Sequence, residues 1–416
     1  MIRLLHTSDW HIGRTLYGRK RYEEHALFLD WLVDTLAREQ VDVLLVAGDV
    51  FDTVAPTNRA QELYYRFLHR AAASGCRHLV VTGGNHDSPS LLDAPKALLS
   101  ALDIHVVGAA TETAAGEVLV LRNAAGSPEL ILCAVPFLRE RDLRFAEAGE
   151  SPDDKERKLT DGIRRHYAEV TEAALEMRRR CLGETGAPAR LPIVGMGHLF
   201  AAGGQVAEND GVRELYVGSL ARFPAGLFPD CFDYLALGHL HVPQQIHGAV
   251  PARYSGSPLP MGFGEAEQAK RVLLVAIDED DVRIEPLAIP VFQTLERVQG
   301  DWETISARLS GLAATHPDAW LEVAYTGDAV LGDLRERLES LVAGTGLELL
   351  RIRNERLADR TLQSFREGET LDDLTDADVF HRCMDANGVP ETQRADLELA
   401  YREITASILE TDRLAE

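Results

Sequence analysis

A glycine-rich turn that carries an amide, an imidazole and a carboxylate follows a strongly apolar segment of this chain. The turn is Gly83-Gly84-Asn85-His86-Asp87, and the apolar segment runs from His78 to Thr82. A short apolar run of this kind predicts a buried strand. Polar groups at the end of such a strand make poor core material but are well placed for chemistry. The turn therefore predicts a functional site at the edge of a sheet.

Four other polar groups follow predicted strands in the same way. A single histidine or aspartate after a strand is usually a hydrogen-bonded surface residue or a turn former. Five such groups suggest a common purpose, because the carboxyl ends of parallel strands meet at one edge of a sheet. We predict a two-metal site whose candidate ligands are Asp9, His11, Asp49, Asn85, His198, His239 and His241.

The donor types narrow the choice of metal. Oxygen and imidazole ligands without a thiolate suit Mn²⁺, Fe²⁺ or Zn²⁺ better than Ca²⁺ or Mg²⁺. Two cations about 4 Å apart need a bridging carboxylate. Asp49 is the candidate, because it follows the most apolar of the predicted strands, Val41 to Ala47. Such a pair of cations lowers the pKa of a bound water, places it in line with a phosphorus atom and stabilises the transition state.

His86 and Asp87 are the predicted catalytic residues. If Asn85 binds a metal, its neighbour His86 points elsewhere and can act on the substrate. We expect Asp87 to orient His86 and to favour its imidazolium form. His86 could then stabilise charge on the phosphate or protonate the leaving oxygen. The alternative is a histidine with a purely structural role.

The order of the predicted elements indicates an α/β protein. Strand-like segments at 2–7, 41–47 and 78–82 alternate with helical patterns at 21–39 and 58–73. This alternation favours a mostly parallel sheet with helices on its faces. We expect the later segments to be a hairpin within 117–137, an inserted amphipathic helix within 139–190, strands at 192–196 and 233–237 that continue the sheet, and a last hairpin within 271–287.

A domain boundary is predicted near Pro290, so that residues 1–290 carry the site. Residues 291–355 alternate between strand and helix without metal-type residues at the strand ends, which indicates a small capping or binding domain. The tail, 361–416, has 14 acidic and 5 basic residues and predicts two amphipathic helices, at 376–385 and 391–409. The tail could dock a protein or pack on the cap, and its pattern alone does not decide between them.

Composition limits the partners and the compartment. A net charge of -23 argues against a general nucleic-acid coat, because phosphate binding is driven by basic surface. Any DNA groove must then be neutralised by metal or supplied partly by a partner. Five widely spaced cysteines predict reduced thiols in a cytosolic protein. We find neither an apolar stretch that would span a bilayer nor a secretory signal, so the protein is expected to stay inside the cell, without membrane contact.

The motifs, taken together and in order, resemble the calcineurin-type metallophosphoesterase superfamily. They are Asp-x-His, Gly-Asp-x-x-Asp, Gly-Asn-His-Asp, Gly-His and Gly-His-x-His, and they cover residues 1 to about 290. More narrowly, the segment His6 to Gly13, the turn Tyr254 to Pro258 and the cap with a helical tail resemble the SbcD family of bacterial nuclease subunits.

The resemblance implies a four-layer β-sandwich flanked by helices. It implies one metal held by Asp9, His11, Asp49 and His241 and a second held by Asp49, Asn85, His198 and His239, with Mn²⁺ as the usual activator. Asp52 departs from archaeal and eukaryotic relatives, which commonly carry a histidine there, so their contact near the metal cannot be transferred.

The resemblance also implies an activity and partners. The activity would be a double-strand exonuclease and a single-strand or hairpin endonuclease in DNA break processing, recombination and replication, with the enzyme near the nucleoid. The tail would bind the root of the coiled coil of an SbcC-like ATPase, and the nuclease subunits would pair as a homodimer within a heterotetramer.

Two other functions are open. A phosphodiesterase for small substrates could use the same scaffold, but the cap and the acidic tail would then be surplus. A scaffold without activity is the third possibility, against which the intact set of candidate ligands argues. Linear duplex DNA and a small phosphodiester, offered with Mn²⁺, would distinguish them.

Overall fold

The computed structural model describes residues 1–144, 150–183, 190–200, 228–278, 281–327, 329, 331, 333–354, 376–386, 394, 397–398 and 401. The chain divides into two compact units, Met1–Thr294 and Leu295–Glu416. Each unit is described by itself below.

The first sheet of the first unit is built on four parallel strands. These are β1 (Ile2–Thr7), β4 (Val43–Ala47), β5 (His78–Thr82) and β6 (Ile104–Val107), which lie side by side in that order. Two antiparallel strands extend the sheet beyond β1: β13 (Arg271–Ile277) and then β14 (Val282–Ala288). The first three parallel strands all end where the sequence places candidate ligands.

A second sheet holds the other strands of the unit. Its order is β11 (Gln244–Ile246), β12 (Ala252–Tyr254), β10 (Tyr234–Gly238), β9 (Ile193–His198), β8 (Pro128–Ala134) and β7 (Val118–Arg122). The four inner strands are parallel, and β7 and β11 are antiparallel to their neighbours. The expectation that the strands near 192–196 and 233–237 continue the first sheet is therefore wrong. Strand periodicity reports a buried strand but not the sheet to which it belongs.

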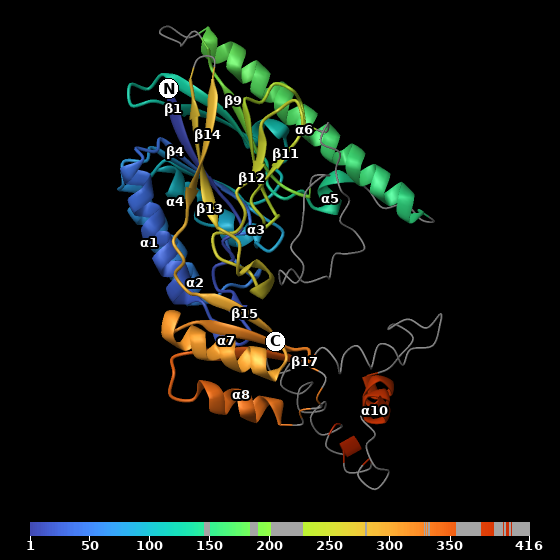
Figure 1. Cartoon of the computed structure of the whole chain (residues 1–416). Coiled ribbons are helices and arrows are strands. Elements are labelled where there is room, and N and C mark those ends of the chain that lie inside the picture. Colours follow the sequence, from blue (N-terminus) through green and yellow to red (C-terminus); the bar gives the residue numbers. More distant parts are fainter. Residues whose placement is uncertain are drawn as a thin grey trace. The chain divides into compact units, whose positions relative to one another are not determined.

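Apolar side chains fill three interfaces and give the unit four layers. Helices α1 (Tyr22–Arg38) and α2 (Asn58–Ala72) cover the outer face of the first sheet, where Trp10 packs edge-on against Phe28 and Phe67. The long helix α6 (Pro152–Leu182) covers the second sheet with Tyr167, Val170 and Ala174 (Figure 1). Leu45 and Val80 meet Leu132 and Met196 between the sheets. The four-layer β-sandwich implied by the resemblance is confirmed.

Short elements complete the first unit. They are β2 (Thr15–Leu16) and β3 (Arg19–Lys20), the helices α3 (Pro89–Asp93), α4 (Lys96–Ser100) and α5 (Glu140–Leu143), and the 3₁₀ turns η1 (Ala114–Glu117) and η4 (Phe263–Glu265). Several helices begin at a side-chain cap. Thr57 accepts a hydrogen bond from the Ala60 amide at the start of α2, and Ser151 accepts one from Asp154 ahead of α6. The inserted helix that the sequence predicts within 139–190 is thus α6.

The second unit is a small parallel α/β module. Strands β15 (Leu295–Gly300), β16 (Trp320–Tyr325) and β17 (Glu348–Asn354) form its sheet, joined by α7 (Trp302–Thr315) and α8 (Leu334–Val342). Leu309, Leu321 and Leu338 lie in its core. Helix α10 (Asp376–Ala386) falls where the first tail helix is expected, whereas most of the second, 391–409, lies outside the described residues.

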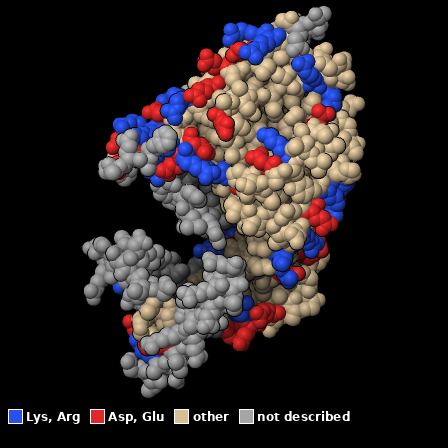
Figure 2. Space-filling view, turned by 180° about the vertical axis from the view of Figure 1, so that it is seen from behind, with Lys and Arg blue, Asp and Glu red and all other residues tan. Residues whose placement is uncertain are grey.

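Charge is mixed on the face of the molecule that Figure 2 shows. Lysine and arginine side chains there alternate with aspartate and glutamate along the first unit. Among the described residues, this view shows no broad basic surface of the kind that would bind a polyanion by charge alone.

Candidate metal centre

Five chain segments bring the predicted ligands together at one edge of the two sheets. Asp9 and His11 follow β1, Asp49 follows β4, and Asn85 follows β5. His198 ends β9, and His239 and His241 follow β10. Most of these side chains are buried, while Asn85 and His239 are half-buried.

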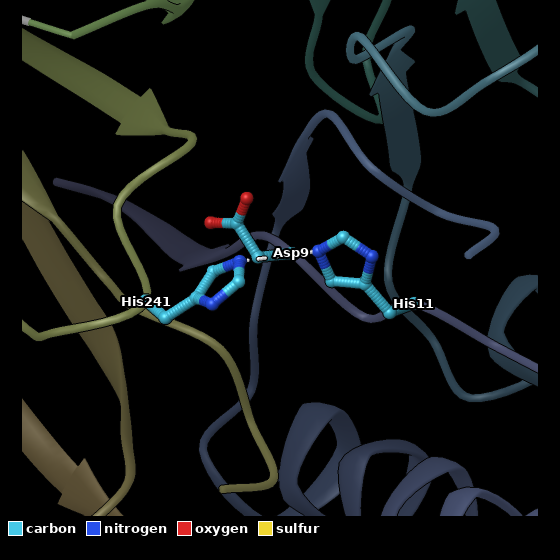
Figure 3. A group of neighbouring side chains, drawn as sticks. All are labelled: Asp9, His11 and His241. Carbon is cyan, nitrogen blue, oxygen red and sulfur yellow. Dashed lines mark hydrogen bonds between the residues drawn. The ribbon is translucent and has the colours of Figure 1, made fainter. Parts of the chain in front are cut away.

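The first group consists of Asp9, His11 and His241. Figure 3 shows the two imidazoles on either side of Asp9, each with a ring nitrogen turned inward. The Nε2 atoms of His11 and His241 lie 3.2 Å apart, and one ligand atom from each of the three residues lies within 4.8 Å of the others. Two nitrogens bound at about 2.1 Å to one cation would have about this separation. The spacing therefore fits a shared ion.

The second group consists of Asp49, Asn85, His198 and His239. The Asn85 Oδ1 atom lies 3.0 Å from His198 Nε2 and 3.0 Å from His239 Nδ1. The Asp49 Oδ2 atom lies 3.3 Å from the same His198 nitrogen. Carboxylate and amide oxygens with imidazole nitrogens are a donor set for a divalent transition metal.

Asp49 lies between the two groups. Its Oδ2 atom is 3.6 Å from His11 Nε2 as well as 3.3 Å from His198 Nε2. Its Oδ1 atom accepts a hydrogen bond of 2.9 Å from the backbone amide of His86, which fixes the carboxylate. A single carboxylate oxygen within reach of both groups is what a pair of bridged cations requires.

The backbone is strained at four of the candidate ligands. Asp9, His11, Asp49 and His239 have φ values of 53°, 48°, 50° and 102°, in the left-handed region that side chains other than glycine rarely adopt. Such conformations cluster at functional sites, where surrounding structure holds them. Sequence reasoning missed this feature, because none of these residues is a glycine.

Glycines make room for two of the candidate ligands. A Cβ atom on Gly84 would lie 2.1 Å from Asp49 Oδ1, and one on Gly48 would lie 2.1 Å from His198 Nδ1. The sequence shows glycines beside the ligands, and the structure gives the reason, which is close approach of side chains to backbone.

The second nitrogen of each of three buried histidines faces an oxygen. His198 Nδ1 lies 2.9 Å from the Ala47 carbonyl, and His11 Nδ1 lies 3.4 Å from Asp52 Oδ1. His241 Nδ1 lies 3.7 Å from Glu265 Oε1. Oxygen partners of this kind fix the ring orientation of metal-binding histidines.

Glu265 is a site residue that the sequence analysis missed. It lies in a turn, far from any strand end, and the buried Lys270 ammonium forms an ion pair with it. Asp52, by contrast, stands out in the sequence as a departure from the family pattern. The structure places its carboxylate against His11 and, at 3.1 Å, against Arg14.

Electrostatics keep the carboxylates of the centre ionised. Burial raises the pKa of Asp49, but the adjacent His198 outweighs burial, and the pKa of Asp49 lies well below its ordinary value. Burial alone would lower the pKa of His198, yet Asp49 raises it to about 9. For Asp52, contacts with His11 and Arg14 overcome burial and lower the pKa to about 2. Anionic carboxylates at neutral pH suit cation binding.

The prediction that Asp87 orients His86 is wrong. The buried Asp87 carboxylate accepts hydrogen bonds from the backbone amides of Gly84, Phe51 and Val50, at 2.8, 2.9 and 3.1 Å. His86 Nδ1 lies instead 2.9 Å from the Asp52 carbonyl. Asp87 thus joins the loop after β5 to the loop after β4. The imidazole is its neighbour in sequence, but the backbone amides of the two loops are nearer in space.

The two-sheet fold and the paired donor groups define a phosphoesterase with a divalent-metal centre. Residues 2–243 match the family described as calcineurin-like phosphoesterase, and residues 291–387 match the type 5 capsule protein repressor C-terminal domain. The SbcD subunit of the nuclease SbcCD from Escherichia coli K12 is 37% identical over 95% of this chain and 96% of its own. The protein of the same name in Rhodobacter capsulatus is 39% identical over 64% of each chain.

The chain belongs to the calcineurin-like phosphoesterases and, among them, to the family of SbcD nuclease subunits. Membership implies that the centre binds divalent metal ions. Among solved structures, a dimetal phosphatase from Danio rerio is 13% identical, with a TM-score of 0.38, and the match covers 69% of this chain and 98% of that one. Likeness at this level says nothing about substrate. Within the described residues, we find no helix long and apolar enough to cross a membrane.

Proposed function

We propose that this chain is a Mn²⁺-dependent DNA nuclease subunit that cleaves phosphodiester bonds at the paired metal centre. The observation that carries the proposal is Asp49 Oδ2, 3.3 Å from a ligand of one group and 3.6 Å from a ligand of the other. Two divalent cations there would supply the Lewis acidity that activates water and offsets charge on the phosphate. The proposed ligands are Asp9, His11, Asp49, Asn85, His198, His239 and His241.

His86 is the proposed catalytic group of the chain itself. Its ring is half-buried, and its centroid lies 4.8 Å from that of His11, so it borders the centre. Because a carbonyl only accepts hydrogen bonds, the Asp52 carbonyl holds a proton on Nδ1 and leaves Nε2 for the substrate. As imidazolium, with a second proton on Nε2, His86 can donate that proton to stabilise charge on the phosphate or to protonate the leaving oxygen.

Asp87 takes a positioning role in this proposal. By accepting three backbone hydrogen bonds, it fixes the turn that presents Asn85 and His86. Burial, with Asp49 nearby, raises the pKa of the Asp87 carboxyl to about 6.

The relatives' name describes one part of a complex, and we propose a similar assembly for this chain. The partner would be an SbcC-like coiled-coil ATPase, bound by the acidic tail at 361–416. That partner would supply the DNA grip that a net charge of -23 does not. We further propose that two nuclease subunits pair in a heterotetramer, that residues 291–355 help to recognise DNA, and that the complex acts in the cytoplasm near the nucleoid on double-strand ends and hairpins.

The discriminating experiment offers linear duplex DNA and a nitrophenyl phosphodiester to the protein with Mn²⁺, with and without the candidate ATPase. We expect cleavage of DNA, increased by the ATPase and ATP. Asp49→Asn serves as the inactive control. Cleavage of the small ester alone under every condition would reject the nuclease proposal.

A further inference from the structure

A second cluster of metal-type side chains lies at the opposite end of the first sheet. His78 is the first residue of β5, Asp103 directly precedes β6, and His105 is the second residue of β6. One ligand atom from each of the three lies within 4.8 Å of the others. The candidate metal centre follows the carboxyl ends of β1, β4 and β5 in the first sheet, whereas this cluster lies at the amino ends of β5 and β6.

Strand register places the two histidines on one face. Val80 is paired with His105, and the strand period of two puts His78 on the same side as Val80. Val80 lies in the core between the two sheets, so both imidazoles face the second sheet. Their ring centroids are 6.0 Å apart.

A hydrogen bond fixes the tautomer of His78. Its Nε2 atom lies 2.9 Å from the backbone carbonyl of Arg122, at the end of β7. Because a carbonyl only accepts, Nε2 must carry the proton, and Nδ1 of the neutral ring presents its lone pair. A histidine that donates one nitrogen to a carbonyl and offers the other is arranged as metal-binding histidines are.

Two ring nitrogens of the cluster have no partner within the described structure. His78 Nδ1 and His105 Nε2 are both buried and accept or donate no hydrogen bond there. The His78 side chain is also nine-tenths buried, at 8% exposure. A buried polar atom without a partner is costly, so the pair calls for a ligand between the rings.

Asp103 supplies the third donor from the solvent side. Its backbone has a φ of 56°, and its carbonyl accepts a 3.1 Å hydrogen bond from the Leu79 amide on β5. Aspartate and asparagine tolerate this left-handed conformation better than most residues. The residue is therefore fixed at the mouth of the histidine pair, with an exposed carboxylate.

We propose that His78, Asp103 and His105 bind a divalent transition-metal ion, with a preference for Zn²⁺. This ion would join the start of β6 to β5. Two imidazoles and one carboxylate, with an open position for water, are a common zinc donor set. The ion would hold β6, the edge strand of the first sheet, and satisfy both buried nitrogens. This site is separate from the proposed nuclease centre and does not depend on it.

The test measures zinc stoichiometry and affinity of the full-length chain by competition with a chromophoric chelator. The variants are His105→Gln and Asp103→Asn, with His69→Gln as the matched control, because His69 is an exposed histidine on α2. We expect His105→Gln to bind one Zn²⁺ fewer than the wild type. We expect Asp103→Asn, which keeps the turn, to weaken that ion by about tenfold or more. His69→Gln should behave as the wild type.

Two further readouts separate this site from the nuclease centre and from a folding defect. In an Asp49→Asn background, His105→Gln should reduce the rise in melting temperature that Zn²⁺ produces, whereas His69→Gln should leave that rise unchanged. Mn²⁺-dependent activity in the Asp49-intact protein should be the same with and without Asp103→Asn. If both variants bind as much Zn²⁺ as His69→Gln with unchanged affinity, the proposal is overturned. If neither the wild type nor any variant had Mn²⁺-dependent activity, that result would instead count against the nuclease proposal.

Discussion

At the residue scale, the site depends on side chains that are fixed by something other than their own sequence neighbourhood. Asp9, Asp49 and His239 could be identified from the sequence as candidate ligands, because each follows an apolar run. Glu265 could not be identified in this way, since only the fold brings its carboxylate to 3.7 Å from the His241 ring. The error over Asp87 has the same origin, because its partners are backbone amides of two loops. Strand ends are visible in sequence, and such contacts are not.

The proposed role of His86 can be tested by truncation. His86→Ala should keep both metal ions, because no proposed ligand changes, and should lower kcat on DNA by about 10² to 10⁴, the usual contribution of a general acid. Metal content measured by elemental analysis, beside single-turnover cleavage, checks both parts. Near-normal turnover at full metal occupancy would reject the role.

The close packing around Asp49 predicts a second effect. Gly84→Ala would place a methyl group 2.1 Å from Asp49 Oδ1, so we expect weaker metal binding and activity reduced at least about tenfold. Gly311→Ala, where nothing lies within 4 Å of the added Cβ, is the control and should be neutral. The comparison uses metal titration and cleavage rates. Equal activity in the two variants would show that the turn at Gly84 can move away from Asp49 to accommodate the methyl group.

At the element scale, the chain alternates between segments that build sheets and turns that carry donors. Helical and strand segments such as α2, α6 and β4 were predictable, because apolar periodicity and caps are local. The division of strands between two sheets was not predictable, since the apolar sequences of β9 and β10 would fit either sheet. Only the packing of Leu45 and Val80 against Leu132 and Met196 decides it.

The turn from η4 to β13 should make stability depend on acid pH. Burial opposes ionisation of Glu265, but His241 and Lys270 outweigh it and lower the pKa of the carboxyl from 4.5 to about 2. A lowered pKa in the folded state gives stability that is present above pH 4.5 and is lost as the pH falls towards 2. This lowering of the pKa corresponds to about 3 kcal/mol of folding free energy at neutral pH.

Urea unfolding of the wild type and Glu265→Gln, between pH 3 and pH 7, measures this contribution. The difference in free energy of unfolding between the two proteins should be largest above about pH 4.5 and should narrow below it. Arg283→Gln, at an exposed surface pair, is a control that should show little dependence. If the difference in free energy of unfolding were constant across this pH range, His241 and Lys270 would not be what keeps the Glu265 carboxyl ionised.

At the scale of the whole molecule, the acidic composition and the metal centre suggest a division of labour. In the proposed assembly, the chain would supply the cleavage site and the partner would supply the DNA-binding surface. Removing 361–416 should therefore abolish co-purification with the candidate ATPase, while metal binding by the first unit, Met1–Thr294, stays intact. Co-expression and affinity capture measure the first effect, and elemental analysis the second. Retained association would place the docking surface elsewhere.

We propose that Asp49 bridges two cations, and crystals of the full-length protein soaked with Mn²⁺ would show whether it does. Anomalous diffraction near the manganese edge should show two peaks about 4 Å apart, both in contact with the Asp49 carboxylate. One peak should contact His11 and His241, and the other should contact His198 and His239. A single peak, or two peaks of which only one touches Asp49, would contradict the account.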